Sequence, residues 1–80
     1  MPTLFYYLGL RFFFYSNDHE PVHIHVSNGS GEARYSVEPV ALISNNGLKT
    51  RDLRIAEAAL EENKEVIIEN WNRYFNKKGI

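Results

Sequence analysis

Three histidines within seven residues, His19, His23 and His25, are the side chains of this chain best suited to chemistry, and they are all the histidine it has. Histidine is the one side chain whose ordinary pKa lets it gain or lose a proton near neutral pH, and it is a frequent metal ligand. Because three histidines scattered at random over 80 residues would rarely fall so close together, we expect the function to lie in this cluster.

Acid–base catalysis is one chemistry that the cluster could perform. Two imidazoles with ordinary pKa values near 6.5 can act as base and acid in the same turnover. RNA can be cleaved in this way without a metal, when one imidazole takes the 2′-hydroxyl proton and the other protonates the leaving oxygen. Arg11 and Arg34 are candidate phosphate contacts that would stabilise the developing negative charge. Tyr15 or Tyr35 could stack on a nucleotide or bond to it.

A metal site is the second interpretation. A His-x-His pair on a strand places two imidazoles, here those of His23 and His25, on one side, and His19 or Asp18 could supply a third ligand. The acid–base mechanism needs no cofactor, whereas this alternative needs a divalent metal such as zinc. The third interpretation is structural, with the imidazoles bonded to neighbouring strands and loops.

The first half of the chain must position these residues, and it has the composition of a sheet. In residues 22–27 apolar and histidine residues alternate, so His23 and His25 should share the face opposite the core. Turn residues precede and follow this segment, including a strong hairpin signal at 28–31. The segments with strand patterns are 4–8, 10–15, 22–27, 32–37 and 40–43.

From Thr50 onward the apolar residues recur with a helical period. Two apolar stripes, one before and one after residues 61–64, predict two helices, because a single long helix could not lay both stripes on so small a sheet. We expect Thr50 to cap the first helix and Asn63 the second. Trp71 is the expected anchor between helix and sheet.

The predicted fold class is therefore α+β, a small antiparallel sheet of three to five strands followed by two C-terminal helices packed on one face. We expect a single domain over residues 1–80, with a strand-rich half at 1–43 and a helical half at 50–78.

Composition narrows the classes of function. The net charge of −1 gives no global attraction to nucleic acid, and the absence of cysteine excludes disulfides and thiolate sites. No apolar run approaches the roughly 20 residues that span a bilayer, and the start of the chain does not resemble a signal peptide. We expect a cytoplasmic protein with no membrane partner, and the composition leaves homo-oligomerisation open.

The stretch Tyr15–Val26 resembles the signature of a bacterial family, the domain-of-unknown-function family numbered 4160. The shared pattern is an aromatic residue, an Asp-His pair, a proline, and then His-x-His followed by an apolar residue. A later Glu-Ala pair at 32–33 and an Asn-Trp pair at 70–71 also match. The chain departs from the pattern at Val22, where the family often has a second proline, and at Ile24, where it often has an aromatic residue.

The resemblance implies a small prokaryotic cytoplasmic protein that is encoded beside another small protein, as in a toxin–antitoxin pair. It implies that the partner is the neighbouring-gene protein, similar to an antitoxin, and that the role of this chain is toxin. Together with the histidine cluster, this predicts a toxin-like component that cleaves RNA with His23 and His25 as the acid–base pair and His19 as an orienting or third group. The alternatives are a non-catalytic protein-interaction module with structural histidines and a metal-dependent hydrolase.

Overall fold

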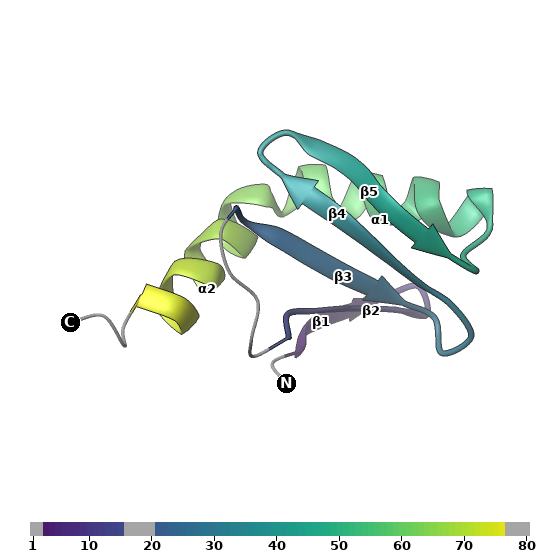
Figure 1. Cartoon of the computed structure of the whole chain (residues 1–80), viewed down its shortest axis with the longest axis horizontal. Coiled ribbons are helices and arrows are strands. Elements are labelled where there is room, and N and C mark those ends of the chain that lie inside the picture. Colours follow the sequence, from purple (N-terminus) through teal and green to yellow (C-terminus); the bar gives the residue numbers. More distant parts are fainter. Residues whose placement is uncertain (1–2, 16–20, 77–80) are drawn as a thin grey trace.

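The computed structural model describes residues 3–15 and 21–76, and it has the predicted α+β fold (Figure 1). Five antiparallel strands lie in the sheet in their chain order, and two helices follow them. The strands are β1 (Thr3–Tyr7), β2 (Leu10–Phe13), β3 (His23–Ser27), β4 (Glu32–Val37) and β5 (Val40–Asn46), and the helices are α1 (Thr50–Glu62) and α2 (Lys64–Asn76).

Short turns join the strands because each turn contains residues that suit it. Leu8 and Gly9 form the two-residue turn between β1 and β2, and both have positive φ, 50° and 82°, as in a type I′ hairpin. In the β3–β4 turn the side-chain oxygen of Asn28 accepts hydrogen bonds from the backbone N–H groups of Ser30 and Gly31, each at 2.8 Å. The strands therefore form a meander, in which each strand pairs with the next one along the chain.

The two faces of the sheet differ in character. Alternate residues of the central strands point toward the helices and are almost completely buried: Leu10, Phe12, Ile24, Val26, Ala33, Tyr35 and Val37. The intervening residues point to the opposite side, and we call this side the histidine face, after His23 and His25. The alternation predicted for 22–27 thus placed Ile24 and Val26 in the core as expected, while Val22 is half-buried.

The helix boundaries differ in detail from the predicted caps. Lys49 is the N-cap of α1 and makes no side-chain capping bond, so Thr50 is the first helical residue and its predicted capping role is wrong. Asn63 separates the helices: its backbone N–H and its side-chain Nδ2 both donate to the Ala59 carbonyl, and its own carbonyl accepts the N–H of Ile67. Two helices form, as predicted, because Asn63 ends α1 and α2 begins at Lys64.

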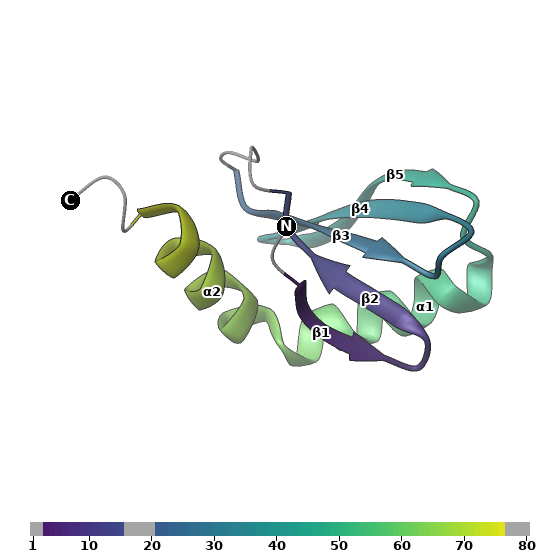
Figure 2. The same cartoon turned by 90° about the horizontal axis from the view of Figure 1, so that it is seen from below.

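The helices attach to the sheet in different ways. α1 runs along one face of the sheet, whereas α2 extends past the end of the strands (Figure 2). The hydroxyl of Tyr35 in β4 donates to the Leu53 carbonyl of α1 at 3.1 Å, and it lies 3.4 Å from Glu57 Oε2. Burial, with a smaller contribution from the nearby negative charge of Glu57, raises the pKa of Tyr35 well above its ordinary value. Tyr35 therefore holds α1 on the sheet as a neutral donor.

Trp71 of α2 is the predicted anchor between helix and sheet. It is fully buried, and its ring centroid lies 5.1 Å from that of Phe14 and 4.3 Å from that of Phe75. This aromatic group fills the space where α2 passes the end of the sheet. No helix in the described part of the chain is long and apolar enough to cross a membrane.

Candidate functional site

The strand register places four side chains in one row across the histidine face, and two of them, His25 and Arg34, are predicted site residues. His25 on β3 pairs with Phe13 on β2 and with Arg34 on β4, and Arg34 pairs with Ser44 on β5. Directly paired residues of neighbouring strands project to the same side of a sheet. Arg34, predicted as a phosphate contact, is therefore an immediate neighbour of His25 on that face.

His25 is covered by aromatic rings, although it lies on the face opposite the helices. Only 6% of its surface is exposed, and its Nε2 atom is buried. The ring of Phe13 stacks on the imidazole at a centroid distance of 5.5 Å, and the edge of the Tyr15 ring approaches it at 4.5 Å. His25 is thus as well packed as a core residue, which the alternating pattern alone does not predict.

Glu32, the first residue of β4, completes this cluster. Its Oε2 atom lies 3.2 Å from His25 Nδ1, and the Tyr15 hydroxyl donates to both carboxylate oxygens, at 3.1 and 3.2 Å. An ionised carboxylate can only accept hydrogen bonds, so Nδ1 of His25 must carry the proton. In the neutral imidazole of His25 the proton is then on Nδ1 and not on Nε2.

The sequence reasoning did not place Glu32 in the site. The signal was present, because Glu32 and Arg34 alternate along one strand as His23 and His25 do along the preceding strand, and the 28–31 turn joins the two. In a hairpin, alternate residues of one strand share a face with alternate residues of the other strand. The register decides whether Glu32 and Arg34 share the face of the histidines, and the pairing Ser27↔Glu32 shows that they do.

His23 lies two residues before His25 and is half-buried. Its Nδ1 atom is 2.9 Å from the Pro21 carbonyl oxygen, which can only accept, so Nδ1 of His23 also carries its proton. The centroid of its ring lies 5.4 Å from that of His25 and 5.3 Å from that of Trp71. The two imidazoles are therefore neighbours, and in both rings Nδ1 is the donor to an oxygen acceptor.

The two candidate arginines have different positions. Arg34 is exposed and lines an open polar groove of about 400 Å³, together with His25, Glu32, Ala33, Ser44 and Asn46. Arg11 is half-buried and pairs with Ser27, one row away. Its Nε donates to Thr3 Oγ1 at 2.9 Å, and its guanidinium carbon lies 4.3 Å from the centroid of the Phe13 ring. The structure brings Arg34 to the groove, whereas it packs Arg11 on the ring that covers His25.

The predicted tyrosines also separate. Tyr15 is half-buried and bonded to Glu32, so it belongs to the histidine cluster. The suggestion that Tyr35 stacks on a nucleotide is wrong, because Tyr35 is fully buried under α1 and its hydroxyl is bonded there. Its place in β4 puts it on the core face, since strand residues alternate and Arg34 points the other way.

The third histidine, His19, and the possible ligand Asp18 lie outside the described residues, so their predicted roles stay predictions. Within residues 3–15 and 21–76 no three His, Cys, Asp or Glu side chains come together as a metal site would require. The Nδ1 atom of His25 is occupied by Glu32 and that of His23 by a backbone carbonyl. A metal bound by either imidazole would therefore have to be ligated through Nε2.

Comparison with known proteins identifies one family. The family model described as "Domain of unknown function (DUF4160)" matches residues 9–72, which include all the described site residues. No curated protein and no solved structure matches the chain.

Proposed function

The chain belongs to the domain-of-unknown-function family DUF4160, and we propose that it is the toxin-like component of a prokaryotic toxin–antitoxin-type pair and cleaves RNA. One observation carries the proposal. Two imidazoles lie with centroids 5.4 Å apart, each held as the Nδ1–H form, and an arginine stands in register beside the second of them. Its partner would be the small protein of the neighbouring gene.

The chemistry follows from the two Nε2 atoms. One unprotonated Nε2 takes the proton of a ribose 2′-hydroxyl while the 2′-oxygen attacks the adjacent phosphorus. The bond from phosphorus to the 5′-oxygen breaks, and the protonated Nε2 of the other imidazole gives its proton to that oxygen. The products are a 2′,3′-cyclic phosphate and a 5′-hydroxyl. No metal takes part in these steps.

Glu32 and Arg34 have distinct roles in this proposal. Glu32 accepts the Nδ1 proton of His25, which orients the ring and stabilises its protonated form, as carboxylates paired with catalytic histidines do. Arg34 lies exposed in the adjacent groove, where its guanidinium can bond to phosphate oxygens in a bidentate manner. Ser44 and Asn46 add neutral polar groups along the same groove.

One observation favours a second function, a non-catalytic interaction module in which the histidines are structural. The Nε2 atom of His25 is buried and its ring is packed by Phe13 and Tyr15. Catalysis by His25 requires that Nε2 become accessible when RNA binds, whereas a structural role does not. Removal of the His25 imidazole therefore distinguishes the two functions. It should abolish activity if the protein is a nuclease, and it should lower stability or partner affinity if the protein is an interaction module.

To test the proposal, the chain is expressed alone in bacteria from an inducible promoter, and the growth of the culture is measured. We expect growth inhibition that is lost in His23→Ala and in His25→Ala. The same inhibition should weaken in Arg34→Gln and persist in the charge-matched control Arg54→Gln, since Arg54 is an exposed residue of α1, away from the groove. Folding of each purified variant is checked by the fluorescence of the buried Trp71. Unchanged toxicity in both histidine variants would exclude the catalytic mechanism.

A further inference from the structure

The outer edge of the sheet at β1 is aromatic and exposed. Within the described part of the chain β1 pairs only with β2, so its other side presents backbone N–H and C=O groups. Tyr6 is 71% exposed, Tyr7 49% and the turn residue Leu8 67%. Edge strands usually carry a charge or a proline that prevents pairing with other chains. The segment Thr3–Tyr7 has neither, so this edge is suited to accept a further strand.

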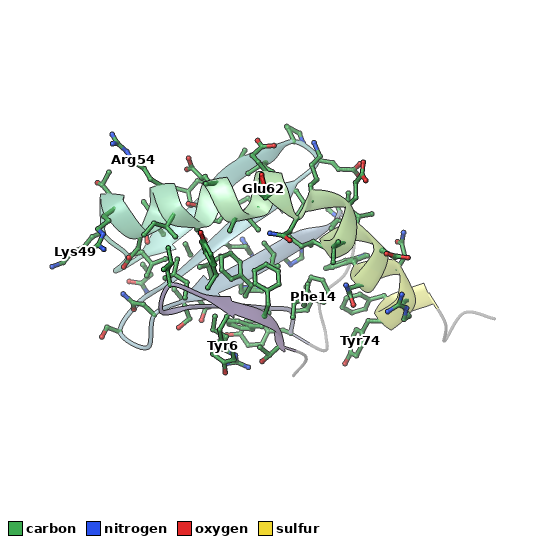
Figure 3. All side chains as sticks on the ribbon, turned by 180° about the vertical axis from the view of Figure 1, so that it is seen from behind. Tyr6, Phe14, Lys49, Arg54, Glu62 and Tyr74 are labelled. Atoms are coloured by element: carbon green, nitrogen blue, oxygen red, sulfur yellow. The ribbon has the colours of Figure 1, made fainter. Side chains whose placement is uncertain are left out.

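A pocket of about 330 Å³ lies beside this edge, between β1 and α1. The strand contributes Phe5, Tyr6 and Tyr7, and the helix contributes Ala58, Ala59 and Glu62. The small side chains of the two alanines leave the space open. Figure 3 shows the two elements, with Tyr6 labelled on β1 and Glu62 on α1; the Tyr6 side chain projects from the side of β1 that faces away from α1.

The residues that line this pocket favour a side chain with an aliphatic stem and a positive charge. Aromatic rings attract a cation over their faces and also cover the aliphatic part of a lysine or arginine side chain. Glu62, an exposed residue of the pocket wall, supplies the negative charge. The adjacent surface at the α1–α2 junction is lined by two more carboxylates, Glu61 and Glu65, and by one cation, Lys64, so its net charge is negative. The charge complement of this surface is therefore a basic segment.

We propose that β1 and the adjoining pocket bind an extended basic segment of a partner protein. The segment pairs with β1 as a sixth strand, and one of its lysine or arginine side chains enters the pocket between Tyr7 and Glu62. This mode combines backbone hydrogen bonds, which give affinity, with a side-chain pocket, which gives specificity. The inference rests on the proposed function only for the identity of the partner, the neighbouring-gene protein.

A peptide titration tests this directly. The probe is a capped peptide of alternating lysine and threonine, added to the isotope-labelled full chain and followed by NMR. We expect saturable shifts at the amides of Tyr6, Tyr7 and Ala58. Ala58→Leu fills the pocket from an exposed helix position and should weaken binding at least about tenfold. Glu62→Gln should weaken it by about fivefold or less, as for an exposed ion pair.

The matched control is Glu69→Gln, which removes the same charge from an exposed position of α2 outside the pocket and should leave affinity unchanged. The proposal is overturned if a glutamate–threonine peptide binds equally well, or if shifts map away from β1. Binding that does not saturate at millimolar peptide also overturns the proposal. So does a dimer of the chain that the Ala58→Leu substitution converts to a monomer, because the occupant of the pocket would then be a second copy of the chain. RNA cleavage by the Ala58→Leu variant is measured separately, without any partner. Cleavage that persists while peptide binding is lost separates the docking surface from the proposed catalytic function.

Discussion

Replacement of Glu32 by glutamine should destabilise the fold more than any exposed charge removal does. The carboxylate accepts hydrogen bonds from His25 Nδ1 and from the Tyr15 hydroxyl, so it links β3 to the segment that follows β2. Glutamine has nearly the same shape but one acceptor oxygen and no charge. The change therefore tests the bonding of the cluster while it preserves the packing.

The expected magnitude comes from the difference between the two kinds of hydrogen bond. A bond to a charged group contributes about 1.5–3 kcal/mol and a neutral one about 0.5–1.5 kcal/mol. Because the Glu32 side chain is 39% exposed, water screens part of this difference, and we expect a total loss of about 1–2 kcal/mol. In a chain of this length that corresponds to a fall in Tm of roughly 5–15 °C.

Urea unfolding measures this loss through the fluorescence of Trp71, the single tryptophan and a fully buried one. Glu38→Gln is the control, because Glu38 is an exposed turn residue. A double-mutant cycle with Tyr15→Phe should show a coupling of about 0.5–1 kcal/mol between Tyr15 and Glu32. If Glu32→Gln costs no more than Glu38→Gln, the Tyr15–Glu32–His25 cluster does not hold together in solution and the reasoning is refuted.

Three further changes test the fold. Tyr35→Phe removes the bond to the Leu53 carbonyl and should cost about 1 kcal/mol near pH 7. The pKa of Tyr35 is raised in the folded state, so the stability that its hydroxyl contributes is fully present below the unfolded pKa of about 10 and is lost as the pH rises toward the folded pKa. In urea unfolding, the difference in the free energy of unfolding between wild type and variant should therefore decrease above about pH 10. Leu8→Asn should raise stability by about 0.5–1 kcal/mol, since Leu8 has positive φ in a turn that favours Asn-Gly; an unchanged Tm would contradict the turn type. Gly31→Ala should cost more than about 2 kcal/mol in the same assay, because its Cβ would lie 2.6 Å from the backbone of Gly47; a variant as stable as wild type would contradict this close approach.

Local patterns in the sequence predicted most of the elements, for physical reasons that can be traced to particular residues. The alternation of apolar and polar residues around Ile24 predicted a strand with one buried face, and the helical period of apolar residues after Thr50 predicted the change from strand to helix. The division into two helices was also predicted, although the capping role of Thr50 was not as predicted, because Lys49 takes the N-cap position. Helix ends depend on tertiary fit as much as on local preference.

The site was harder to predict because it depends on pairing between strands. The histidine pair on one face followed from spacing, but the partnership of His25 with Glu32, Arg34 and Phe13 depends on the register of three strands. The burial of His25 depends on the same register, which places aromatic rings over it. A single sequence contains these residues without showing which of them meet.

Cleavage of a labelled single-stranded RNA by the purified chain, in the presence of a metal chelator, tests the central claim most directly. The account predicts fragments that end in a 2′,3′-cyclic phosphate, their absence with His23→Ala or His25→Ala, and their persistence with Arg54→Gln. RNA that stays intact in excess protein, or cleavage that continues unchanged in either folded histidine variant, would contradict the claim.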